Sequence, residues 1–164
     1  MAARDGGPVQ FDASDTSAAV DLLHAHATPP DDITDWIDIR PLDVPADRLP
    51  TTKGLLGRTK VADPPSAQII WVDPATGRGD STINLELPGH DAGTVVAALG
   101  PPPPGWQVEP AKACVIVHAD VGLVPEQLVG FAVEALGAAL GGWSGRYEAT
   151  GVHVDTTHGY HSVF

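Results

Sequence analysis

The chain has 164 residues and a formal net charge of −12 with neutral histidines, and 43% of its residues are hydrophobic. This length suits a single domain, 1–164, and the acidic excess disfavours nucleic acids and anionic membranes as partners. Cys114 is the one cysteine, which excludes an internal disulfide. The sequence shows neither the apolar core of a signal peptide nor a membrane span of about 18 apolar residues. We therefore expect a cytoplasmic protein, and richness in Ala, Gly, Pro and Asp is typical of bacteria of high GC content.

The N-terminal part predicts a strand, a helix and a second strand. Residues 8–11 form a short apolar run, and the helix is expected over about 14–27, with Ser14 or Asp15 as its N-cap. Prolines stop this helix, and alternation over 33–39 then favours a strand.

Residues 41–66 are the least structured part of the sequence. Five prolines interrupt every periodicity, so we expect a long connector. It overlaps a basic segment, residues 48–78, which carries a charge of +3, whereas residues 1–47 carry −8 and residues 79–164 carry −7. The basic side chains of this segment are Arg48, Lys53, Arg58, Lys60 and Arg78.

The second half predicts a hairpin followed by alternating helices and strands. The expected elements are strands 67–73 and 81–87, a helix over 90–100, an extended segment over 101–106, a strand over 111–120, a helix over 125–142 and a strand over 143–155. Gly130 and Gly137 fall on one face of the long helix, where another element is expected to approach closely. Gly151 is the site of an expected β-bulge. A polar tail is expected from about residue 156.

This order of elements predicts an α+β domain. We expect a mixed, mainly antiparallel sheet with helices packed on one face, in a ferredoxin-like or related two-layer sandwich. Side chains from the strand over 111–120 and the long helix should share its core: Val115, Val117, Leu128, Phe131 and Leu136.

Histidines cluster at the end of the chain. His153 and Asp155 share one face of an extended strand, and His158 and His161 join them if the tail folds back. The spacing matches no closed metal template, so we expect no metal or other cofactor. A His/Asp metal site remains the alternative, with His118 as a general base that a carboxylate such as Asp120 would orient.

An acidic stretch surrounds one tryptophan in the second strand. The carboxylates of Asp31, Asp32, Asp35 and Asp38 lie close to Trp36 in the sequence. An aromatic side chain among carboxylates is typical of an interface anchor with a charged rim. The alternative is an ordinary acidic strand whose Trp36 turns into the core.

Residues 114–143, CVIVHADVGLVPEQLVGFAVEALGAALGGW, carry a resemblance to a known class. This run resembles the C-terminal half of small acidic immunity proteins of bacterial polymorphic-toxin systems. The match covers about a fifth of the chain, and the long proline-rich connector departs from it. The resemblance implies inhibition of a partner protein, such as a cognate toxin, by direct binding, with neither catalysis nor a cofactor.

Three hypotheses follow for function. The first is an immunity-like or antitoxin-like inhibitor that binds a protein. The second is a small metal-assisted hydrolase or lyase that uses His118, His153 and Asp155. The third is an accessory subunit of a larger assembly. No complete catalytic constellation can be assembled from the sequence, which favours binding; the oligomeric state is left open.

Overall fold

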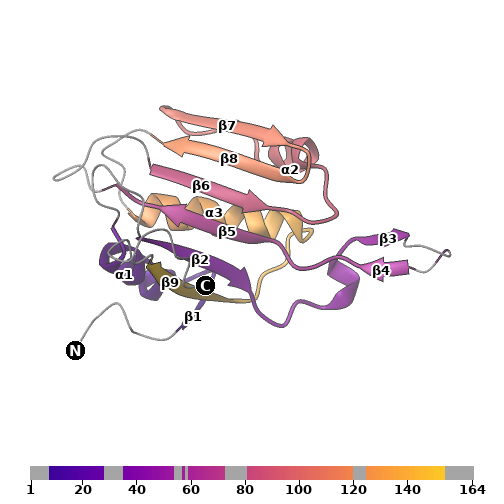
Figure 1. Ribbon diagram of the computed structural model, residues 1–164, viewed down its shortest axis with the longest axis horizontal. Helices are drawn as coiled ribbons and strands as arrows, with labels where there is room; N and C mark the ends of the chain where they lie inside the picture. Colours follow the sequence, from indigo (N-terminus) through magenta and orange to yellow (C-terminus); the bar gives the residue numbers. More distant parts are fainter. Residues whose placement is uncertain are drawn as a thin grey trace, which may run out of the picture.

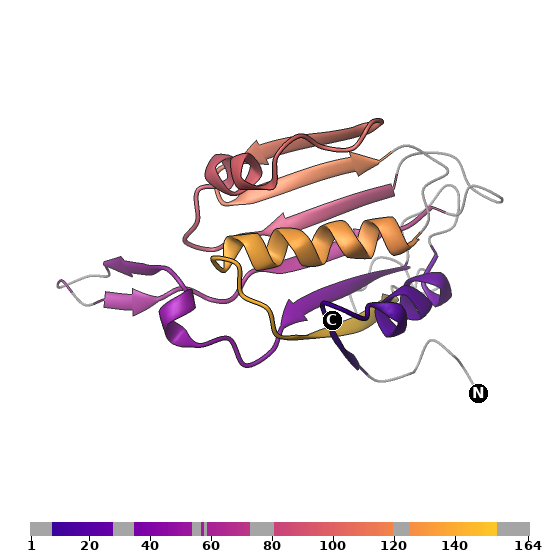
Figure 2. The same cartoon turned by 180° about the vertical axis from the view of Figure 1, so that it is seen from behind.

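A computed structural model of the chain describes residues 8–27, 35–53, 57, 59–72, 81–119 and 125–153. These residues form one layer of strands and one layer of helices (Figures 1 and 2). The main sheet has the order β1-β9-β2-β5-β6-β8-β7, and a separate hairpin pairs β3 with β4. Its strands are β1 (Val9–Asp12), β2 (Asp35–Pro41), β5 (Ser66–Ile70), β6 (Ser81–Glu86), β7 (Trp106–Ala111), β8 (Cys114–Ala119) and β9 (Arg146–His153). The helices are α1 (Ser17–Ala25), α2 (Ala92–Leu99) and α3 (Pro125–Ala139).

Every pairing in the main sheet is antiparallel. The α+β sandwich is therefore confirmed, and the sheet contains no parallel pair among its described strands. Each edge is a split β-α-β unit: β1 and β2 run parallel with β9 between them, and β6 and β7 run parallel with β8 between them. Split units of this kind are the elements of ferredoxin-like folds. Helix α3 makes the long return connection from β8 to β9.

The helices cover one face of the sheet. Helix α3 crosses the middle of the sheet against β2, β5 and β6, while α1 packs near β1 and β9, and α2 packs near β7 and β8 (Figure 2). The expected core is present, because Val115, Val117, Leu128 and Leu136 are all buried, and Phe131 packs against them at the margin. No described helix covers the opposite face, which Figure 1 presents to the viewer.

Helix ends follow ordinary capping chemistry. Asp91 caps α2 by accepting a hydrogen bond from the Thr94 amide, and α2 lies within the helix expected over 90–100. The N-cap of α1 is Thr16, so the expected cap at Ser14 or Asp15 is wrong by one or two positions. The Asp15 carboxylate still accepts bonds from the amide and hydroxyl of Ser17, which holds its pKa below the usual value.

The proline-rich connector is more ordered than its sequence suggests. It contains a 3₁₀ turn, Ala46–Arg48, and the hairpin of β3 (Thr51–Lys53) and β4 (Thr59–Val61), which projects from one end of the sheet (Figure 1). Arg48 fastens this arm to the body by donating to the carbonyl oxygens of Leu140 and Gly141 beyond the end of α3. The Arg48 guanidinium is therefore engaged as a cap for α3.

The expected close approach to α3 is confirmed at Gly137 and wrong at Gly130. A β-carbon at Gly137 would lie 3.2 Å from the carbonyl oxygen of Trp143, whereas one at Gly130 would meet no atom within 4 Å. Gly151 pairs with Ile37 in unbroken register, so there is no bulge. A β-carbon at position 151 would overlap the imidazole ring of His26, which explains why glycine stands there.

Candidate functional site

The alternation of β2 divides the acidic stretch between the two faces of the sheet. Ile37 and Ile39 point to the core, whereas Trp36 and Asp38 point to the uncovered face and are half-buried. The alternative in which Trp36 turns into the core is therefore wrong. Asp35 points the other way, beneath the helices, and is 1% exposed, so its inclusion in an exposed acidic rim is also wrong. Asp31 and Asp32 lie outside the described residues.

A shallow pocket of about 280 Å³ adjoins Trp36 on the uncovered face. The side chains that line it come from three adjacent strands: Trp36, Gln68, Ile70, Thr82 and Asn84. Apolar surface continues beyond it, since Val152 pairs with Trp36 in the neighbouring strand and Ile116 of β8 is 39% exposed. This part of the sheet therefore combines an aromatic ring with aliphatic neighbours at an accessible surface.

A chain of hydrogen bonds crosses four strands beside this pocket. Gln68 of β5 donates to Asp38, and Asn84 of β6 donates to Gln68. The Cys114 thiol of β8 then donates to Asn84, with 2.9 Å between Sγ and Oδ1. Arg40 completes the chain by donating to the other oxygen of Asp38 at 3.0 Å. The side-chain amides of Gln68 and Asn84 each donate one hydrogen bond and accept one in this series, so the orientations of the linked side chains are mutually fixed.

The environment of Cys114 does not favour a nucleophile. Burial raises the pKa of its thiol, and the negative charge of Glu86 raises it further. Only the thiolate attacks an electrophile, and here the protonated form is the one that donates to Asn84. Cys114 thus serves as a hydrogen-bond donor on the sheet surface.

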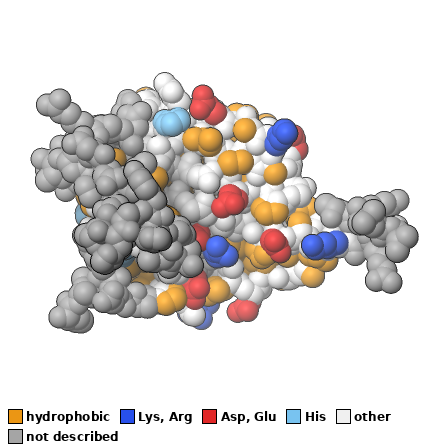
Figure 3. Space-filling view, viewed as in Figure 1, with side chains coloured by type: hydrophobic (Ala, Val, Ile, Leu, Met, Phe, Trp, Pro, Cys, Tyr) orange, Lys and Arg blue, Asp and Glu red, His pale blue; other side chains and the backbone are white. Residues whose placement is uncertain are grey.

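Acidic groups outnumber basic groups on the uncovered face. Strand alternation places five carboxylates and two guanidinium groups there: Asp12, Asp38, Glu86, Glu109 and Glu148, with Arg40 and Arg146. The hydrogen bond to Asp38 raises the pKa of Arg40, and the charges of Glu86 and Glu148 add to the effect. Figure 3 shows acidic and basic side chains interspersed with hydrophobic side chains on the side seen in Figure 1.

A second polar cluster lies beneath the helices, where α1 ends beside β2 and β9. Oδ1 of Asp35 lies 2.7 Å from Nδ1 of His153 and 3.4 Å from Nδ1 of His26. His26 is as buried as Asp35, whereas His153 is 45% exposed. The cluster therefore ties the end of α1 to both central strands through one carboxylate.

The histidines proposed for metal chemistry are only partly described. His153 directs Nδ1 to Asp35, while Asp155, His158 and His161 lie outside the described residues. His118 has its Nε2 3.7 Å from Oε2 of Glu109, and Asp120 again lies outside. Within the described ranges no group of three or more His, Cys, Asp or Glu side chains is arranged to hold a metal ion.

Comparison with models of protein families, with curated proteins and with solved structures found no match for this chain. None of the helices in the described residues is long and apolar enough to cross a membrane.

Proposed function

We propose that this chain is a non-catalytic inhibitor of the immunity type, which binds a basic partner protein, such as a cognate toxin, through the uncovered face of its sheet in the bacterial cytoplasm. The observation that carries the proposal is the position of Trp36. Its ring stands on the accessible side of a central strand, among Ile70 and Val152. Tryptophan is strongly enriched among the residues that dominate binding energy at protein interfaces.

The charge of the same face supports a basic partner. Its excess of carboxylates would steer a positively charged surface toward Trp36 and speed the encounter. The hydrogen-bonded chain from Arg40 to Cys114 supports the same interpretation, because side chains that are already fixed lose little conformational entropy on binding. The thiol of Cys114, which stays protonated, argues against thiolate catalysis at this face.

The kinetics of binding to the product of the neighbouring gene test this proposal. Trp36→Ala should weaken binding by about 30-fold, mostly through faster dissociation, which corresponds to roughly 2 kcal/mol for an interface anchor. Asp38→Asn combined with Glu86→Gln should instead slow association at low salt, and the difference from wild type should shrink as salt rises.

Glu126→Gln provides the matched control, because Glu126 is an exposed carboxylate in the first turn of α3, on the helical side of the molecule. It should leave both rates unchanged. Wild-type kinetics in the Trp36→Ala and Asp38→Asn/Glu86→Gln proteins would refute binding through this face.

A further inference from the structure

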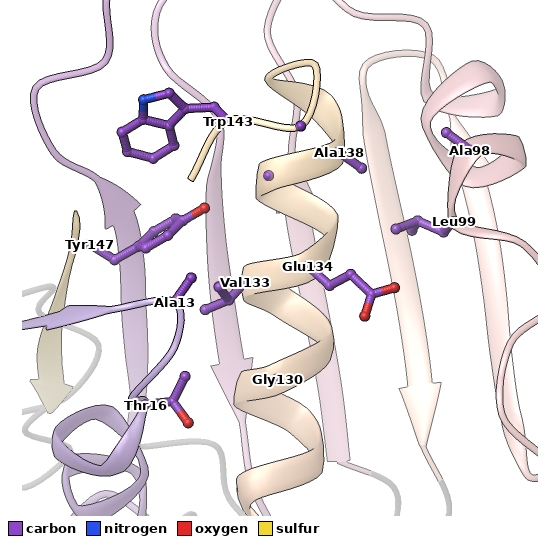
Figure 4. A pocket seen from close by; sticks show the side chains of 12 residues that line it. Ala13, Thr16, Ala98, Leu99, Gly130, Val133, Glu134, Ala138, Trp143 and Tyr147 are labelled. Atoms are coloured by element: carbon purple, nitrogen blue, oxygen red, sulfur yellow. The ribbon is translucent and has the colours of Figure 1, made fainter. Parts of the chain in front are cut away.

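The outer side of α3 carries a groove of about 470 Å³ on the side opposite to the uncovered sheet face. Gly130 and Gly137 line it on α3, and the helix backbone is accessible at Gly130, where a β-carbon would meet no atom within 4 Å. Thr16, before α1, borders the groove on one side, and Leu99 of α2 borders it on the other (Figure 4). The groove therefore runs over α3 between the two flanking helices.

A buried phenol opens into one side of this groove. Tyr147 of β9 is only 1% exposed, and its ring is held between Phe11, at a centroid distance of 5.7 Å, and Trp143, at 5.5 Å. Its Oη points toward α3 and would lie 3.7 Å from a β-carbon at Gly137 (Figure 4). The hydroxyl makes no hydrogen bond with another described residue and lines the groove, so it can donate to a ligand oxygen there.

The protonation state of Tyr147 makes it a donor. Burial raises its pKa to about 12, so the phenol keeps its proton at every physiological pH. The ligand group that can pair with it is therefore a neutral or anionic acceptor, such as a carbonyl oxygen.

A carboxylate lies across the groove from the phenol. Glu134 shares the outer stripe of α3 with Gly130 and Gly137, and its side chain leans toward α2 (Figure 4). It is exposed and has no ion pair with the other described residues. The groove thus offers a donor on one side of α3, a carboxylate on the other, and glycine backbone and small apolar side chains between them.

A second copy of this chain is a poor occupant. A two-fold contact centred on the stripe would bring Glu134 close to its own copy, and each chain already carries a net charge of −12. Charge complementarity instead selects a cation, and the hydroxyl of Tyr147 selects a carbonyl oxygen. Lysine and arginine in a peptide both join these groups by an apolar stem, and the planar guanidinium, which pairs with a carboxylate through two N–H groups, favours arginine.

We propose that this groove binds an arginine residue of a partner protein, whose backbone carbonyl accepts a hydrogen bond from Tyr147 and whose guanidinium group pairs with Glu134 across α3. The alkyl stem would lie over α3 at Gly130, where a β-carbon would meet no atom within 4 Å. This site is separate from the uncovered sheet face, so it stands or fails independently of the function proposed above.

The probe for this site is N-acetyl-arginine amide, and N-acetyl-citrulline amide is its uncharged control of nearly equal shape. Binding can be followed in the ¹⁵N spectrum through the indole N–H of Trp143, assigned with Trp143→Phe, because this residue lines the groove. Wild-type protein should bind the arginine probe at least about fivefold more tightly than citrulline, since only the former forms a charge-assisted pair.

Two variants separate the roles of the two side chains. Glu134→Gln should abolish the preference for arginine, and Tyr147→Phe should weaken both probes several-fold, by about the value of one hydrogen bond, while keeping the aromatic stack. Glu126→Gln, at the start of α3 and away from the groove, should change neither result. Equal binding of the two probes, a preference that survives Glu134→Gln, or unchanged affinity in a folded Tyr147→Phe protein would each overturn the proposal.

Discussion

Gly151→Ala should destabilise the protein because the added methyl group collides with a buried ring. The backbone at Gly151 has no positive φ, so alanine is conformationally acceptable there and by itself would stabilise the chain by about 0.4–1 kcal/mol. The β-carbon would, however, overlap the imidazole of His26, which is held beside the buried Asp35. Overpacking of this kind costs about 1–3 kcal/mol, so we expect a net loss of roughly 1–2 kcal/mol.

Urea denaturation followed by circular dichroism measures this loss as a lower midpoint with an unchanged slope. Gly130→Ala is the matched control: it also replaces glycine by alanine, but in open space within a helix, and should stabilise the protein by up to about 1 kcal/mol. In a His26→Ala background, the cost of Gly151→Ala should largely disappear, since the methyl group would enter the vacated space. A Gly151→Ala protein as stable as wild type would refute the close packing of His26 on β9.

Other predictions concern single residues. Leu136→Ala should lower the free energy of unfolding, measured by urea denaturation, by about 2–5 kcal/mol, because the Leu136 side chain on α3 is fully buried in the core. A loss below about 1 kcal/mol would contradict that placement. Cys114 should react with iodoacetamide more slowly than a free thiol at neutral pH, since burial and Glu86 raise its pKa; a faster reaction would show that the thiol is not held as described. Ultraviolet titration should show Tyr147 ionising near pH 12, and Tyr147→Phe should remove that step. Because this folded-state pKa lies above the ordinary value of 10, the stabilisation linked to the Tyr147 proton is complete below about pH 10 and declines toward pH 12.

Local patterns predicted the elements whose sequences carry strong periodicity. Alternation located β6, turn residues predicted its pairing with β5, and the apolar run that begins at Pro125 predicted α3. Strand β7 was missed, because four prolines and a glycine precede Trp106 and concealed the strand that follows. The hairpin of β3 and β4 was missed for the same reason, since its proline-rich flanks favour an irregular connector.

The candidate site was only partly predictable. A run of acidic residues around Trp36 suggested one surface, yet the period of two in a strand sends Asp35 to the opposite face from Asp38. That division follows from the sequence once the strand is accepted. The pairing of Asp35 with His153 was beyond local reasoning, because the two residues are 118 positions apart and meet only through the pairing of β2 with β9.

The role of the uncovered face can be tested most directly with ¹⁵N-tryptophan protein and the product of the neighbouring gene. The side chain of Trp36 lies on that face, whereas Trp71 and Trp106 are buried and serve as internal references. At saturation, we expect the Trp36 signal to shift or broaden while the signals of the two buried tryptophans stay in place. An unchanged Trp36 signal in a saturated complex would contradict binding through the uncovered face of the sheet.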